Sequence, residues 1–215
     1  MSPLTRGIAL LVTAALLGAC VQPATGTSSD KPSGNTPEKA ATAKTQLAAL
    51  KTAASRSMAG YSREKFPHWR AQGGGCDTRE FVLKREGKSV KTDSACKVTG
   101  GSWTSPYDDA KHTVAIEMDI DHMVPLANAW RSGANDWTNE KRGDFANDLD
   151  RPQLFAVTAS VNRAKGDQDP STWKPPSRSY WCSYAESWIN VKSHWQLTVT
   201  EAERTALTDM LGTCT

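Results

Sequence analysis

Apolar residues recur at helical spacing near the start of the folded part of the chain. The Ala-rich stretch from about 37 to 58 carries apolar side chains three or four residues apart, at Leu47, Leu50, Ala54 and Met58. This spacing predicts a modestly amphipathic helix. The segment 61–69 follows and is expected to be a loop held by its aromatic side chains.

The C-terminal part repeats this periodicity with larger side chains, at Tyr184, Trp188, Val191 and Trp195. They would share one helix face, which we interpret as core packing rather than as a platform for stacked bases. Thr200 and Glu203 have the spacing of a capping box, and Gly212 is expected to end the last helix.

Short apolar runs in the middle of the chain predict strands. Phe81–Leu83, Val90 and Lys97–Thr99 are separated by glycines, as strands often are. From Thr113 to Asp121 apolar and acidic residues alternate, so the apolar set is expected on one face and the acidic set on the other. The apolar set is Val114, Ile116, Met118 and Ile120.

The segments that follow alternate between helix and strand. Leu126–Arg131 and Thr138–Leu149 have helical patterns, Leu154–Ala156 could form a short second strand, and a helix from about Thr158 to Lys165 would end near Gly166. The fold class expected from these patterns is α+β.

The N-terminus carries a pattern typical of export. Arg6 precedes an apolar run, Ile8–Leu17, which is long enough for a signal peptide and too short to span a bilayer stably. Small residues then lead to Cys20, which resembles the lipobox of bacterial lipoproteins. The resemblance implies removal of residues 1–19 and a lipid on Cys20 that anchors the chain to a membrane; ordinary cleavage beside an incidental cysteine is the alternative.

Composition bounds the rest of the chain. Residues 20–36 are rich in Ser, Thr, Gly and Pro and predict a flexible tether, which leaves 37–215 as the folded domain. Hydrophobic residues make up 38% and charged residues 23% of the chain, which is typical of a globular protein. The formal charge of +3 permits a polyanionic partner without requiring one.

The cysteines support an extracytoplasmic location. If Cys20 is lipidated, an even set of four remains, which in an exported protein indicates disulfides. Three pairings are possible. We favour Cys76 with Cys96 and Cys182 with Cys214, because each closes a short local loop.

Two separated motifs carry the candidate chemistry. The first, Asp119-Ile120-Asp121-His122-Met123-Val124-Pro125, places carboxylates and an imidazole at the end of an expected strand. The second, Asn162-Arg163-Ala164-Lys165, lies about forty residues later near the end of an expected helix, with Asn162 and Lys165 on one face. The order is strand, loop, short strand and helix, as in a ββα-metal finger.

Together these motifs resemble the two halves of HNH nucleases. They are similar to the HNH domains of RNA-guided CRISPR effectors and to the C-terminal domain of GmrSD-type restriction enzymes, and 61–195 looks like small secreted actinobacterial proteins of the HNH family. The resemblance implies that His122 is the general base and that Asp121 and Asn162 bind Mg²⁺ or Mn²⁺. Lys165 and Arg163 would hold the substrate phosphate.

Other candidates are less sharply defined. Asn147 is the best match for the middle Asn of the family and would orient His122 through its backbone, although Arg151 is an alternative for that position. Asp119 could orient His122 or bind the metal through water. Arg79 and Arg63 are possible cations of a substrate groove, with a structural ion pair as the alternative. The other histidines, His68, His112 and His194, are interpreted as structural or surface residues.

The expected protein is thus an exported endonuclease of DNA or RNA without strong sequence specificity. Its fold would be a ββα-metal core with additional N-terminal strands and C-terminal helices, stapled by two disulfides. No base-reading module is visible in the sequence. Two alternatives remain: a phosphoesterase that acts on a smaller substrate, and a non-catalytic surface lipoprotein that uses an HNH-like fold for binding.

Overall fold

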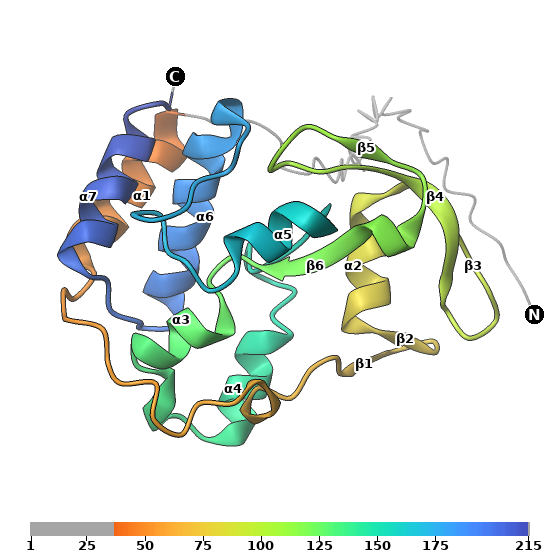
Figure 1. Ribbon diagram of the computed structural model, residues 1–215, viewed down its shortest axis with the longest axis horizontal. Coiled ribbons are helices and arrows are strands. Elements are labelled where there is room, and N and C mark those ends of the chain that lie inside the picture. Colours follow the sequence, from red (N-terminus) through yellow and green to blue (C-terminus); the bar gives the residue numbers. More distant parts are fainter. Residues whose placement is uncertain (1–36, 215) are drawn as a thin grey trace, which may run out of the picture. The chain divides into compact units, whose positions relative to one another are not determined.

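The computed structural model describes residues 37–214, which form a mixed α+β unit (Figure 1). The expected signal peptide, the lipidation site Cys20 and the tether lie outside the described residues. Among the residues described, no helix is long and apolar enough to cross a membrane.

The helical part is formed by both ends of the described chain. Helices α1 (Pro37–Ala49), α6 (Trp181–His194) and α7 (Glu201–Leu211) pack together (Figure 1). Tyr184 and Trp188 of α6 are fully buried. The predicted aromatic face of α6 is therefore confirmed as core packing. The capping box of Thr200 and Glu203 is also present.

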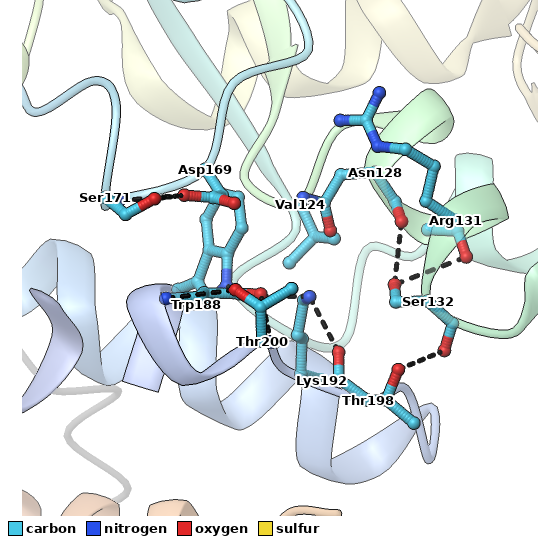
Figure 2. Close-up of polar contacts among 12 residues, drawn as sticks. Val124, Asn128, Arg131, Ser132, Asp169, Ser171, Trp188, Lys192, Thr198 and Thr200 are labelled. Carbon is cyan, nitrogen blue, oxygen red and sulfur yellow. Dashed lines mark hydrogen bonds and ion pairs between the residues drawn. The ribbon is translucent and has the colours of Figure 1, made fainter. Parts of the chain in front are cut away.

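Helices α6 and α7 are joined by a buried ion pair. Lys192 Nζ lies 2.7 Å from Glu203 Oε1 and donates to the Thr198 carbonyl at 2.9 Å. Figure 2 shows Lys192 reaching toward Thr198, with Trp188 and Thr200 nearby. The Trp188 indole also donates to Glu203, so this carboxylate is satisfied from two sides.

The strands form three small antiparallel sheets. Strand β1 (Ala71–Gly73) pairs with β2 (Cys76–Asp77). Strands β3 (Lys88–Thr92), β4 (Val98–Thr104) and β5 (Lys111–His112) pair in that order.

The third sheet positions the candidate site. Strand β6 (Met118–His122) pairs with β7 (Leu154–Thr158), with Asp121 opposite Phe155. Helix α5 (Ala159–Lys165) follows β7 directly and contacts both strands. The predicted order of strand, short strand and helix is confirmed, and its physical basis is the alternation in β6: Met118 and Ile120 are buried toward α2 (Thr78–Glu86), whereas Asp119 and Asp121 face α5.

Two shorter helices connect β6 to β7. They are α3 (Leu126–Arg131) and α4 (Asn139–Ala146), both close to the predicted bounds. One-turn helices lie at Arg63–Lys65, Ala115–Glu117, Ala134–Asp136 and Arg178–Tyr180.

Three of the sequence predictions are wrong in detail. Phe81–Leu83 belongs to helix α2 and not to a strand, because Asp77 caps the helix by accepting from the Glu80 N–H. The run from Thr113 is interrupted by the turn at Ala115–Glu117, so Ile116 is 85% exposed. The first helix stops at Ala49 rather than near 58, since the chain then extends to pair Thr52 with Val199.

Both predicted disulfides are present. Cys76 is bonded to Cys96, and Cys182 is bonded to Cys214. The first joins β2 to the loop before β4, and the second joins the start of α6 to the segment after α7.

Candidate active site

His122 ends strand β6 with its side chain buried and one ring nitrogen held. Its Nε2 lies 2.9 Å from the carbonyl oxygen of Ala146, at the end of α4. Because a carbonyl oxygen can only accept, Nε2 carries the proton and Nδ1 keeps its lone pair. This tautomer leaves Nδ1 as the nitrogen that can accept a proton.

Aromatic residues from the N-terminal loop surround this imidazole. The Trp69 ring stacks on the His122 ring, with centroids 5.4 Å apart and planes within 4° of each other, and the His68 ring lies 5.9 Å away, edge-on. Burial lowers the pKa of His122 from 6.5 to about 3, with smaller contributions from the charge of Arg63 and from His68. The imidazole is therefore neutral at physiological pH.

Asp121 is held by two buried partners. Its Oδ2 accepts from the Tyr107 hydroxyl at 2.5 Å and from Lys165 Nζ at 2.6 Å. Burial raises the pKa of Asp121 and lowers that of Lys165, and the attraction between the two charges opposes both shifts. The other oxygen, Oδ1, accepts no hydrogen bond from the described residues.

Lys165 is placed differently from the expectation of a phosphate-binding cation. It is fully buried, and it also donates to the His122 carbonyl at 2.8 Å. The reason is that α5 packs directly on β6, so a lysine on its inner face pairs with the strand carboxylate. Lys165 thus fixes the end of β6 and has no surface to offer a substrate.

Asn162 lies one helical turn before Lys165 on the same face of α5, as its spacing predicts. Its Nδ2 donates to Asp119 Oδ2 at 3.2 Å. This bond turns the amide so that Oδ1 accepts nothing from the described residues. Asp119 therefore orients Asn162, and among the described residues its side chain forms no hydrogen bond with His122.

A cleft of about 410 Å³ joins these groups. Asp121, His122 and Asn162 line it together with the exposed Arg63 and Arg163. This arrangement is consistent with the prediction that a base, oxygen ligands and basic residues lie in one cleft.

Two candidates lie elsewhere. The Asn147 side chain bonds Arg70 N, Thr78 Oγ1 and the Pro67 carbonyl, so it ties α4 to the loop that carries Trp69. The backbone carbonyl that orients His122 was expected to belong to Asn147. It belongs instead to the preceding residue, Ala146.

Arg79 is also a structural residue. Its guanidinium donates to the Met118 carbonyl at 3.0 Å and pairs with Glu80, which places it at the start of β6 and outside the cleft lining. Of the two expectations for Arg79, a substrate-groove cation or a structural ion pair, the structure shows the ion pair. Arg151 likewise pairs with Asp148 and Asp150.

Three residues that surround the site were not predicted from the sequence: His68, Trp69 and Tyr107. His68 was interpreted as structural, yet it lies beside His122. The only sequence signal for His68 and Trp69 was the aromatic loop 61–69, and Tyr107 had none. By contrast, His112 bonds Glu117 and Thr158 and is structural, as predicted.

The donor set of the cleft fits a hard divalent cation. Asp121 Oδ1 and Asn162 Oδ1 are oxygen donors without partners among the described residues, and both side chains line the cleft. A second group with suitable spacing, Cys182, Glu186 and Cys214, is excluded because both sulfurs form the disulfide.

Residues 77–210 match the family described as GmrSD restriction endonucleases, C-terminal domain. The match covers more than half of the sequence and includes both motifs. The chain belongs to this family. The predicted relationship to the GmrSD-type domain is thereby confirmed, and the family indicates a nuclease-like function.

One relative extends beyond the region of this match. An uncharacterized secreted protein of Arthroderma benhamiae is 56% identical over 175 residues, which is 81% of this chain and 86% of the relative. No solved structure matches the chain.

Proposed function

We propose that this protein is a metal-dependent endonuclease that hydrolyses phosphodiester bonds of DNA or RNA, and that β6, β7 and α5 are its ββα-metal core. The observation that carries the proposal is the geometry of His122: a neutral imidazole with one nitrogen held by Ala146 and the other available, in a cleft lined by Asp121 and Asn162.

The reaction requires a proton acceptor, and Nδ1 of His122 would fill this role. It takes a proton from water, the oxygen of that water forms a bond to phosphorus, and the bond from phosphorus to the leaving oxygen breaks. The leaving oxygen is protonated, which yields a phosphate monoester end and a hydroxyl end. The half-buried Trp69 ring, stacked on His122, would keep the imidazole plane fixed during this step.

Asp121 and Asn162 would hold Mg²⁺ or Mn²⁺ through their oxygens. When bound, the cation supplies positive charge to the phosphate and to the leaving oxygen. Lys165 and Tyr107 hold the Asp121 carboxylate in place through its Oδ2. Arg163 is exposed at the cleft and would contact the substrate phosphate, as the sequence suggested.

We also propose that the protein acts outside the cytoplasm. The export pattern of residues 1–19, the two disulfides and a relative named as secreted support this location. A lipid on Cys20 would retain it at a membrane. The cleft carries no base-reading module, so we expect little sequence specificity.

The test is cleavage of supercoiled plasmid by the purified protein, with Mg²⁺ or Mn²⁺ and with EDTA. We expect nicking that needs the metal and that falls by roughly 10²- to 10⁴-fold in His122→Ala. The matched control is His194→Ala, which removes an exposed histidine that does not line the cleft. Equal cleavage by both variants would refute the proposal, and so would inactivity of the wild type on DNA and RNA with either metal.

A further inference from the structure

Part of the cleft wall comes from outside the family match. Met58, Tyr61 and Arg63 line the cleft together with His122, although the matched region begins only at residue 77. This segment is anchored rather than loosely attached. Tyr61 packs edge-on against Trp130, and Phe66 is fully buried between the aromatic rings of the core.

Within the part of the chain that the structure describes, two arginine side chains of the cleft lining form no ion pair. Asp121 is paired with Lys165, and Asp167 is paired with Arg131 at 2.5 Å. Among the described residues, no side chain forms an ion pair or hydrogen bond with the guanidinium of Arg63 or of Arg163. Both are exposed, one on the loop wall and one on α5.

Two guanidinium groups that line one cleft, neither of them in an ion pair among the described residues, suit a chain of phosphates. Arginine matches phosphate oxygens with two parallel N–H donors, and it contributes to affinity without reading bases. Arg63 also lines the same cleft as His122. A phosphate bound by Arg63 would therefore lie beside the one that is attacked.

We infer that Arg63 binds a backbone phosphate of the nucleic acid, so that the segment Met58–Arg63 forms one wall of the substrate groove and Arg163 the other. The inference deepens the proposed function and rests on it. It extends the substrate site to residues that precede the region shared with the family.

Binding can be measured separately from cleavage. We would use fluorescence anisotropy of a labelled 20-base-pair DNA duplex, and of the RNA duplex of the same sequence, with the full chain carrying His122→Ala so that the probe stays intact. Into this background we would introduce Arg63→Ala, Arg63→Lys and Lys51→Ala. The last is a matched control that removes one exposed positive charge outside the cleft lining.

We expect Arg63→Ala to weaken binding by about tenfold, the effect typical of losing a hydrogen bond to a charged group. It should also reduce the slope of log K against log salt concentration by about 1, as loss of one phosphate contact does. Arg63→Lys should recover part of the affinity, and Lys51→Ala should stay close to the parent.

The inference is overturned if Arg63→Ala binds like Lys51→Ala, or if the parent binds neither duplex. The proposed function is judged separately by plasmid cleavage. A wild type that cleaves DNA while Arg63→Ala binds normally would remove this inference and leave the nuclease intact. A protein that binds through Arg63 but never cleaves would support the phosphate contact and refute the nuclease activity.

Discussion

At the scale of single residues, the proposed chemistry depends on how His122 is held. Ala146 fixes one ring nitrogen, and Trp69 covers one face of the ring. Neither contact is local in sequence, so each depends on the tertiary fold. Positioning of this kind matters because displacing a catalytic group by about 1 Å can cost roughly 100-fold in rate.

Replacing Trp69 tests this positioning. We expect Trp69→Ala to lower kcat by roughly ten- to a hundredfold with little change in KM, because the imidazole gains freedom while substrate contacts remain. Trp69→Phe keeps a flat ring and should recover most of the rate. Steady-state cleavage of an oligonucleotide would measure both constants. A change in KM alone, or equal losses in the Phe and Ala variants, would argue against a positioning role.

The depressed pKa of His122 also predicts a pH dependence of stability. The imidazole has a pKa near 6.5 in the unfolded chain and about 3 in the folded protein. As pH falls below 6.5, the unfolded chain gains a proton that the folded protein does not, so stability is lost at about 1.4 kcal/mol per pH unit down to about pH 3.

Urea unfolding at pH 7.5 and pH 5 would check this expectation. Between the two, wild type should lose about 2 kcal/mol more than His122→Asn, which has no proton to gain at that position. Parallel losses in the two proteins would mean that the His122 imidazole takes up its proton over the same pH range in the folded protein as in the unfolded chain.

At the scale of secondary-structure elements, the predicted and observed chain agree best where periodicity is long or where motifs constrain it. The order of β6, β7 and α5 followed from the two motifs and their spacing, and the core face of α6 followed from four aromatic and aliphatic positions. The strand predicted at residues 81–83 is wrong because a run of three apolar residues fits either a strand or a helix. Its helical form is decided by Asp77 as a cap and by burial of Val82 and Leu83.

The junction of α6 and α7 was only partly predictable. The capping box was visible in the sequence, but the pairing of Lys192 with Glu203 was not, because nothing in a sequence marks one lysine as buried. Both side chains are almost completely buried and are satisfied by several hydrogen bonds. One of them, from Lys192 to the Thr198 carbonyl, is seen in Figure 2.

Breaking this pair should be costly. Lys192→Met would leave Glu203 buried without its counter-charge, and we expect the free energy of unfolding to fall by about 3–5 kcal/mol. The double variant Lys192→Met with Glu203→Gln should recover part of that loss, because no uncompensated charge remains. Chemical denaturation of the single and double variants gives the coupling between them. Additive losses would show that the two side chains do not act as a pair.

At the scale of the whole molecule, the described chain consists of a small core, formed by β6, β7 and α5, with further helices and strands before and after it. Two disulfides cross-link these additional segments. The disulfide pairing was predictable from local loop lengths. The site was predictable only in part. His122, Asp121 and Asn162 came from motifs, whereas Trp69, Tyr107 and the burial of Lys165 depend on packing between distant segments.

The disulfide Cys182–Cys214 should stabilise the helical part without serving the chemistry. Its loop of 32 residues contains α6 and α7, so Cys182→Ala with Cys214→Ala should lower the free energy of unfolding by about 2–4 kcal/mol. Cleavage by the folded variant should stay near the wild-type rate, since neither cysteine lines the cleft. Thermal unfolding and plasmid cleavage would measure the two effects. Unchanged stability, or folded but inactive protein, would contradict this assignment.

The proposed role of His122 as general base is tested most directly by the single-turnover cleavage rate of His122→Gly, with and without added imidazole. We expect the variant to be slower than wild type by roughly 10²- to 10⁴-fold, and imidazole to restore part of the rate, while a salt of equal ionic strength does not. Cleavage by His122→Gly at the wild-type rate without imidazole would contradict it, because the reaction would then need no base at this position.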